Sequence, residues 1–304
     1  MSLPSLEAAL ATGSPVTVCA RPWAEDLLAA YPLAGFIPMT GRWRRDRAAV
    51  HAARRAAGHR QARGLLLPDS LSSALVFRFA GLPCAGYRDD GRSPLLRWPC
   101  RKPHEPMHAV QSWFHLTRFA LSAWRLPLPE ATPPTELSWR ANPVHESLAQ
   151  HAMAQAELTP GQFVLIAPTA TGLHHGRIKV WDGFDTLTRS LQTAGYKVVM
   201  APPPAERVAA QRTAPTAQLL EPLTLGAFAQ LAHHAAVVVC NDSGVSHLAA
   251  AACASQITLF GVTEASRTGP WSNQALRLGN MNRWPSGPEV LAATLTQLHT
   301  IHPA

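Results

Sequence analysis

Residues 235–252 read AAVVVCNDSGVSHLAAAA, and this stretch decides the fold. Residues 237–240 form a short, wholly apolar run, which is typical of a strand buried on both faces of a parallel sheet. Residues 241–244 (Asn-Asp-Ser-Gly) then favour a tight turn, and an alanine-rich helical spacing follows. Open α/β sheets bind ligands at such strand–turn–helix junctions. The alternative is that the turn only caps the helix, since Asp and Ser are common caps.

The rest of the chain repeats this alternation of strand and helix. Strands are expected at residues 16–20, 35–39, 64–67, 84–87, 163–167, 197–201, 237–240 and 256–260. Helices are expected at residues 3–11, 24–30, 71–80, 109–123, 145–156, 181–194, from after Glu206 to about 214, 225–235 and 286–298. An arginine-rich run at 43–63 favours a solvated helix face. Such alternation predicts an α/β fold with parallel sheets and helices on both faces.

Length and composition indicate two folded domains. The chain has 304 residues, more than one domain usually holds, and 47% are hydrophobic whereas 15% are charged. The proline-rich stretch 126–138 (LPLPEATPPTELS) is the best candidate linker. We therefore expect domains at residues 1–140 and 141–304, with the last helix as a candidate to pack back on the first domain.

The formal net charge of +8 favours an anionic partner, which can be nucleic acid, a nucleotide, a phosphorylated glycan or an acidic membrane face. Residues 88–108 are expected to form a long basic loop that suits an anionic acceptor, or else an ordinary solvated loop. No apolar run is long enough to span a membrane, no secretory signal is recognisable, and the five cysteines are far apart. These features predict a cytoplasmic protein.

Polar residues follow three strands of the second half, at what should be one edge of its sheet. They are Thr169, Thr171, Gly172 and Lys179 after the first strand, Glu206 after the second, and Asp242, Ser243, Gly244 and His247 after a later one. A helix N-terminus with a lysine and hydroxyls suits a pyrophosphate, and a carboxylate one strand away suits a ribose. No G-x-G-x-x-G or P-loop lysine motif is present, which disfavours redox and ATPase chemistry. The pairs His174-His175 and His233-His234 lack a third ligand at suitable spacing, so no metal is expected.

At this point the residues resemble a known family. The run 241–250 (NDSGVSHLAA) is similar to the donor motif of the ADP-heptose:lipopolysaccharide heptosyltransferases, glycosyltransferase family 9. Other similar segments are Pro168-Thr169 with Lys179-x-Trp181, residues 259–263 (LFGVT), Leu67-Pro68-Asp69-Ser70 with Ser73-Ala74, and Ala80-Gly81-Leu82-Pro83. The series Gly86-Tyr87, Arg92 and Leu95-Leu96 resembles the heptosyltransferase II branch, and the resemblance covers nearly the whole chain.

The resemblance implies a GT-B fold, with two Rossmann-like domains whose parallel sheets face each other across a cleft. It implies no metal and no cofactor, an ADP-sugar donor on the second domain and a phosphorylated, Kdo-bearing lipid acceptor on the first. By the same resemblance, Lys179 and Thr169 would contact the diphosphate, and Ser243 and Gly244 would donate backbone N–H groups to it. Asp242 and His247 would orient the sugar–diphosphate end. Glu206 would contact the ribose or adenosine. The acceptor contacts would include Ser70, Arg88, Arg92, Arg101 and His108.

One part of the family pattern has no counterpart. Family members open with a strand and a Gly-Asp turn whose aspartate is the suggested general base, whereas residues 1–4 here align with the helix that follows that turn. The strand should be central in the first sheet, so its absence would interrupt the hydrogen-bonded ladder. Either the true protein starts upstream of Met1, or the chain is a truncated homologue.

We therefore predict an inverting, metal-independent glycosyltransferase that moves heptose from ADP-heptose to the phosphorylated inner core of lipopolysaccharide. It would be a monomer in peripheral contact with the anionic inner-membrane face. One alternative is a catalytically inactive homologue that only binds nucleotide sugars. The other is a basic nucleic-acid-binding protein, which the absence of a recognised nucleic-acid module disfavours.

Overall fold

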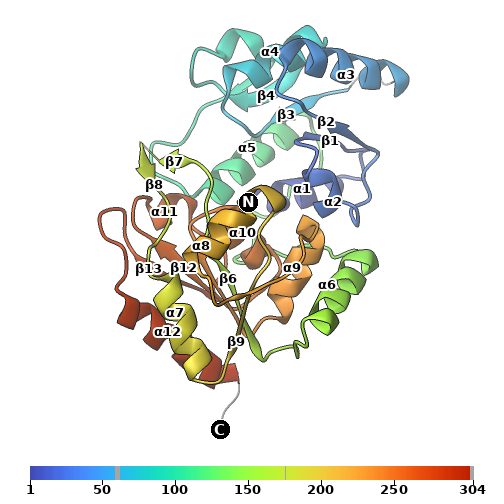
Figure 1. The fold of residues 1–304 in the computed structure, drawn as a ribbon. Coiled ribbons are helices and arrows are strands. Elements are labelled where there is room, and N and C mark those ends of the chain that lie inside the picture. Colours follow the sequence, from blue (N-terminus) through green and yellow to red (C-terminus); the bar gives the residue numbers. More distant parts are fainter. Residues whose placement is uncertain (59–61, 175, 302–304) are drawn as a thin grey trace. The chain divides into compact units, whose positions relative to one another are not determined.

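The computed structural model describes residues 1–58, 62–174 and 176–301. The chain divides into two compact units, unit 1 over Met1–Pro134 and unit 2 over Thr135–Ala304 (Figure 1). The division falls inside the proline-rich stretch 126–138, close to the predicted boundary at residue 140. Both units alternate strands with helices, and the α/β class is confirmed.

Unit 2 is built on one six-stranded sheet. The strands lie in the order β10 (Gln218–Leu219), β9 (Lys197–Met200), β6 (Phe163–Ala167), β11 (Val237–Asn241), β12 (Gln256–Phe260) and β13 (Ala275–Gly279). Every pair in this sheet is parallel, as predicted. From β6 the chain adds β9 and β10 toward one edge of the sheet. It then returns to the centre and adds β11, β12 and β13 toward the opposite edge. The strand order therefore reverses between β6 and β11, and the carboxyl ends of these two strands are where such a sheet binds ligands.

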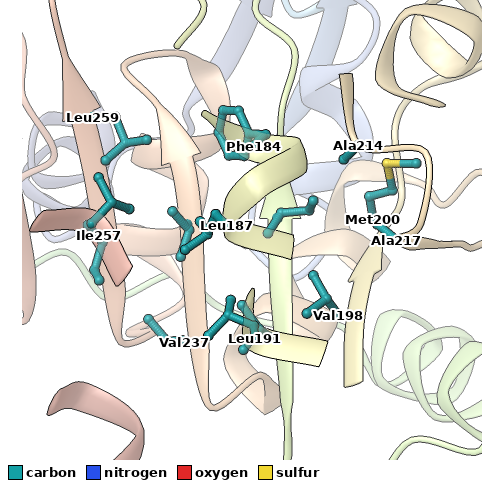
Figure 2. Packing of buried hydrophobic residues seen from close by; sticks show 14 of the residues in the cluster. Phe184, Leu187, Leu191, Val198, Met200, Ala214, Ala217, Val237, Ile257 and Leu259 are labelled. Carbon is teal, nitrogen blue, oxygen red and sulfur yellow. The ribbon is translucent and has the colours of Figure 1, made fainter. Parts of the chain in front are cut away.

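Helices cover both faces of this sheet because successive strand side chains point to opposite sides. Val237 and Val239 pack in one core and Val238 and Cys240 in the other. The first core is covered by α7 (Phe184–Thr193), α8 (Arg207–Thr213) and α12 (Gly287–Ile301), and the second by α6 (Pro143–Gln155), α9 (Leu225–His234) and α10 (Gly244–Ala251). In Figure 2, Phe184, Leu187 and Leu191 of α7 lie over the strands.

The closing helix α12 packs within its own unit. It contacts α7 and β11, and its residues Val290 and Leu298 are part of the first core. Both side chains are almost fully buried there. Burial against unit 2 thus accounts for these apolar residues of the last helix, and packing of the same helix on the first domain stays a prediction.

Unit 1 has two smaller parallel sheets. β1 (Thr17–Ala20) pairs with β2 (Gly35–Pro38), and β3 (Gly64–Leu66), β4 (Cys84–Tyr87) and β5 (Trp98–Cys100) lie in that order in the other. Its helices are α1 (Leu3–Leu10), α2 (Ala24–Leu27), α3 (Trp43–Ala56), α4 (Leu71–Phe79) and α5 (Ala109–Ala123). Helix α1 packs on α5, and α3 packs on α4. Among the described residues no ladder joins the two sheets.

Several segments differ from the prediction. The expected loop 88–108 contains a 3-10 turn (Ser93–Leu95) and strand β5, which is short, lies at a sheet edge and includes Pro99. A proline within a short run of residues argues against a strand unless that strand lies at the edge of a sheet. Pro99 therefore explains why a loop was predicted where β5 forms. The expected loop 168–180 contains a small antiparallel hairpin, β7 (Leu173–His174) with β8 (Arg177–Ile178). The arginine-rich helix ends at Ala56, and residues 59–61 lie outside the described part.

The remaining elements are short. They are a 3-10 turn at Pro204–Glu206 and helix α11 at Ala265–Thr268. In the described ranges no helix is both long and apolar enough to cross a membrane.

Candidate functional site

Three side chains meet at the carboxyl edge of the unit 2 sheet. The ammonium group of Lys179, in the loop after β6, lies 3.3 Å from Oδ2 of Asp242, the first residue after β11. Thr263, which follows β12, donates its hydroxyl to the same oxygen at 2.6 Å. Asp242 is almost fully buried, whereas about a fifth of the Lys179 side chain is exposed. An anion arriving at this edge therefore meets a lysine that is already held in place.

The N-terminus of α10 lies beside this pair. Ser243 is its N-cap, and the Ser243 hydroxyl accepts a hydrogen bond from the backbone N–H of Val245. The cap is therefore Ser243 and not Asp242, whose carboxylate is used by Lys179 and Thr263. Gly244 begins the helix at an exposed position, and a methyl group added there would meet no atom within 4 Å. His247 lies one turn further along α10. The open first turn leaves room for a ligand against the backbone.

A second polar pair links the loops after β6 and β9. Thr169 donates its hydroxyl to a carboxylate oxygen of Glu206. Glu206 ends the turn that follows β9, and strand β9 is the neighbour of β6 in the sheet. The two predicted residues are thus brought together. Thr171 and Gly172 lie exposed in the same loop as Thr169, with no contact to this pair among the interactions described.

Asn241 anchors the loop that carries Lys179. Its side-chain oxygen accepts the backbone N–H of Trp181 at 2.9 Å, and its amide donates to the carbonyl of Ala167 at 3.4 Å. The buried Trp181 indole donates in turn to the carbonyl of Pro285. These contacts fix both ends of the loop. The sequence predicted no role for Asn241 and Thr263, although both occur in the quoted motifs, because their partners lie on other strands.

In unit 1 the predicted acceptor residues fall into two groups. Arg88, Arg101 and Ser70 are exposed, and Ser70 also caps α4 by accepting the backbone N–H of Ser73. His108 is instead buried, and its Nδ1 accepts the backbone N–H of Val110 at the start of α5. The exposed residues can reach a ligand directly. His108 supports the N-terminus of a helix.

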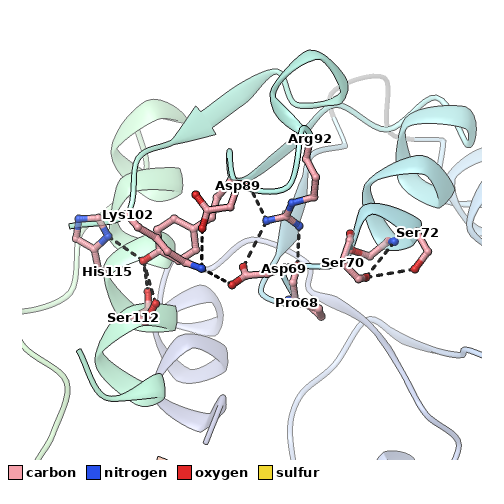
Figure 3. Close-up of polar contacts among 11 residues, drawn as sticks. Pro68, Asp69, Ser70, Ser72, Asp89, Arg92, Lys102, Ser112 and His115 are labelled. Carbon is pink, nitrogen blue, oxygen red and sulfur yellow. Dashed lines mark hydrogen bonds and ion pairs between the residues drawn. The ribbon is translucent and has the colours of Figure 1, made fainter. Parts of the chain in front are cut away.

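Arg92 has no exposed surface at all. Its guanidinium donates to the carbonyls of Tyr87 at 2.6 Å and Pro68 at 2.8 Å, and lies 3.4 Å from Oδ1 of Asp69 (Figure 3). The structure gives Arg92 a packing role. Direct contact with an acceptor would require the guanidinium to leave both carbonyls, and that of the buried Tyr87 would then lack this partner.

A charged cluster not predicted as a site surrounds Lys102. Its ammonium lies 2.6 Å from Asp69 and 2.7 Å from Asp89, and each carboxylate is about one-third exposed (Figure 3). Burial acts to lower the pKa of Lys102, but its hydrogen bonds to both carboxylates outweigh burial and raise that pKa. Asp69, Asp89 and Lys102 follow β3, β4 and β5, so this cluster lies at the carboxyl edge of the unit 1 sheet. The cluster becomes apparent only once the order of β3, β4 and β5 in the sheet is known.

In the part of the chain that is described, the pair His233-His234 does not assemble a metal site. There, no group of three or more His, Cys, Asp or Glu side chains has the geometry to hold a metal ion. His233 and His234 turn to different partners, the carbonyl of Ala252 and the carboxylate of Glu146. His175 lies outside the described residues.

Comparison with known proteins assigns the class. The model of glycosyltransferase family 9 (heptosyltransferase) matches residues 51–295, and the chain belongs to this family. The Escherichia coli lipopolysaccharide heptosyltransferase 3 is 30% identical over 125 residues, which are 38% of this chain and 36% of that protein. The matching stretch thus spans about a third of the length of this curated relative.

Solved structures agree with the fold. Escherichia coli ADP-heptose lps heptosyltransferase II superposes with a TM-score of 0.72 at 23% identity, covering 100% of this chain and 95% of that one. The Escherichia coli heptosyltransferase WaaC with ADP superposes with a TM-score of 0.69 at 22% identity, covering 98% and 94%. The two Rossmann-like units therefore have the GT-B fold. Since relatives of types II and 3 both match, the particular resemblance to the heptosyltransferase II branch stays a prediction.

Proposed function

We propose that this protein transfers a heptose from ADP-heptose to the phosphorylated inner core of lipopolysaccharide, with inversion at the anomeric carbon and without a metal ion. The observation that carries the proposal is the position of Lys179 and Asp242. They come together at the carboxyl ends of β6 and β11, where the strand order reverses, in a chain of glycosyltransferase family 9. The donor site is thus expected in unit 2.

Each donor residue has a role that its position supports. Lys179 and Thr169 contact the diphosphate, together with the N–H groups of Ser243 and Gly244 at the start of α10. Asp242 and His247 orient the sugar–diphosphate end. Glu206, one strand away, contacts the ribose or adenosine. The heptosyltransferase solved with ADP supports the choice of an adenine nucleotide.

The reaction is a single displacement. An acceptor hydroxyl oxygen attacks the anomeric carbon, the bond between that carbon and the diphosphate breaks, and ADP leaves with the bonding electrons. The hydroxyl proton passes to a general base, and we assign this role to none of the residues named above. Negative charge grows on the leaving diphosphate, and Lys179 and the α10 N-terminus stabilise it without a metal. In unit 1, exposed Arg88 and Arg101 and the hydroxyl of Ser70 contact the phosphorylated, Kdo-bearing acceptor. Arg92 and His108 support that surface from within.

The decisive experiment combines binding with turnover. Calorimetry with ADP, UDP and GDP is expected to show a preference for ADP, and ADP-heptose with a phosphorylated Kdo-lipid acceptor is expected to release ADP and extend the acceptor. ADP binding without transfer would instead identify a nucleotide-sugar-binding protein without activity. Binding of duplex DNA in preference to ADP would contradict both the transferase function and the function of an inactive nucleotide-sugar-binding protein. We further propose that the protein acts as a cytoplasmic monomer in peripheral contact with the membrane that carries its acceptor.

A further inference from the structure

Helix α3 presents an unusually basic outer face. Arg44, Arg45 and Arg55 are exposed, as are Ala48 and Ala52 between them. The opposite face of the helix is buried through Asp46 and Val50. The arginines therefore point away from unit 1 because its core takes up the other side of the helix.

Two exposed aromatic side chains belong to the same pair of helices, α3 and α4. Trp43 begins α3 with 48% of its surface exposed, and the guanidinium of Arg44 lies 6.0 Å from its ring centre. Phe79 ends α4 with 59% exposed, and its carbonyl accepts a hydrogen bond from Arg47, one turn after Trp43. Helices α3 and α4 lie side by side in unit 1 (Figure 1). We call Trp43, Arg44, Arg45, Arg55 and Phe79 the α3–α4 surface.

The charge of this surface is not balanced locally. Residues 42–68 contain eight arginines and a single acidic residue, Asp46. Asp46 is buried, and its carboxylate accepts hydrogen bonds from the backbone of Thr40 and Gly41 and from the Thr40 hydroxyl. Helix α4 has no acidic residue. The exposed positive field of α3 is therefore available to an anionic partner.

We propose that the α3–α4 surface binds the anionic face of a lipid bilayer. Arginines near such a surface are attracted to acidic headgroups, and exposed Trp and Phe side chains are stabilised at the boundary between headgroups and acyl chains. A duplex nucleic acid would use the arginines but would leave Trp43 and Phe79 exposed to water. The combination of both residue kinds thus favours a membrane.

This inference deepens the proposed function, because a lipid-borne acceptor must be met at a membrane. Its test uses neither donor nor acceptor, so the two proposals can fail separately. Full-length protein is sedimented with vesicles of phosphatidylcholine alone or mixed with phosphatidylglycerol. We expect binding to the mixed vesicles only, weakening as salt is added.

Two variants locate the contact. R44Q/R45Q/R55Q is expected to bind the mixed vesicles on the order of 100-fold more weakly, since each arginine near an anionic membrane strengthens binding about five-fold. W43A/F79A is expected to keep the salt dependence but to bind more weakly at every salt concentration. Thermal melting shows whether each variant stays folded, and we expect both to do so because the changed side chains are exposed.

The matched control is R189Q/R212Q/R283Q, which removes the same charge from exposed positions of unit 2. It should bind the vesicles within about two-fold of wild type, because charges more than about 10 Å from the membrane are largely screened by salt. Failure of the wild-type protein to bind mixed vesicles would overturn the proposal, as would equal losses in the two triple variants. Binding of duplex DNA that R44Q/R45Q/R55Q abolishes, with no vesicle binding, would assign the surface to nucleic acid instead.

Discussion

The ammonium group of Lys179 lies 3.3 Å from the carboxylate of Asp242, although the two residues follow different strands of the unit 2 sheet. Asp242 is nearly buried, and the hydroxyl of Thr263 donates to the same carboxylate oxygen that Lys179 approaches. A diphosphate that binds here must compete with Asp242 for Lys179. The ion pair therefore positions the lysine before the ligand arrives. Lys179 should strengthen diphosphate binding, whereas the carboxylate of Asp242 should oppose it.

Replacing Lys179 by Gln is expected to weaken ADP binding about 10- to 100-fold, since a hydrogen bond to a charged group contributes about 1.5–3 kcal/mol. Isothermal titration calorimetry measures the affinity. Lys197→Gln is the matched control, because Lys197 lies at the opposite end of the sheet, at the start of β9. Equal affinities for wild type and Lys179→Gln would contradict the assignment.

Asp242→Asn is expected to act in the other direction on binding. Removal of the carboxylate charge frees Lys179 and reduces repulsion of the phosphates, so ADP should bind as tightly as to wild type or more tightly. Transfer should still slow by about 10-fold or more, because the orienting carboxylate is lost. The measurements are calorimetry with ADP and initial rates with ADP-heptose. A large loss of ADP affinity would show that Asp242 maintains the site instead of orienting the sugar.

Glu206→Gln tests the nucleoside contact. In this variant the hydroxyl of Thr169 can still donate to the side-chain carbonyl of the glutamine. A ribose hydroxyl, however, loses a charged carboxylate as its hydrogen-bond acceptor. We expect ADP affinity to fall about 10-fold while the affinity for inorganic pyrophosphate stays unchanged. The two titrations are run on the same protein sample. Parallel losses for both ligands would place Glu206 at the phosphates.

Arg92→Met is expected to lower the free energy of unfolding by about 3 kcal/mol, because the carbonyls of Tyr87 and Pro68 lose their buried donor. Urea denaturation followed by circular dichroism gives this value. The exposed Arg88 provides the control, and Arg88→Ala should change stability by no more than about 0.5 kcal/mol. A stable Arg92→Met protein that fails only in transfer would show that Arg92 meets the acceptor directly.

Asp46 is expected to make the stability of unit 1 depend on acid pH. Burial acts to raise its pKa, but hydrogen bonds from Thr40 and Gly41 and the charge of Arg21 bring the net pKa below the ordinary 3.8. Because the pKa is lower in the folded state, the stabilisation is complete above the unfolded-state pKa and is lost as the pH falls through the folded-state value. Wild type should therefore exceed Asp46→Asn in unfolding free energy at pH 7, and the difference should shrink below about pH 4. A difference that is constant with pH would contradict this explanation.

The core strands of unit 2 could be predicted from the sequence because they are buried on both faces. Residues 163–167 (FVLIA) form an uninterrupted apolar run and residues 256–260 (QITLF) a mostly apolar one, and the structure has β6 and β12 over the same residues. The edge strands could not be predicted in this way. β13 is partly exposed, and β5 contains a proline.

The same contrast applies to the candidate site. The order of motifs along the chain predicted that Lys179, Glu206 and Asp242 share one edge of a parallel sheet, and they do. It did not predict that Lys179 pairs with Asp242, or that Thr263 joins them, since these contacts depend on which strands are neighbours. It also treated all arginines of residues 88–108 alike, whereas Arg92 is fully buried and Arg88 is exposed.

By itself, the sequence determined the alternation of strands and helices, the parallel sheets and the turn at residues 241–244, because local apolar runs and turn residues carry this information. Only the tertiary structure decided which polar side chains meet and which are buried. The physical reason is that pairing and burial depend on strand order and on packing between distant segments. The run AAVVVCNDSGVSHLAAAA therefore predicts where a ligand binds, and loops after the neighbouring strands supply Lys179 and Thr263 beside Asp242.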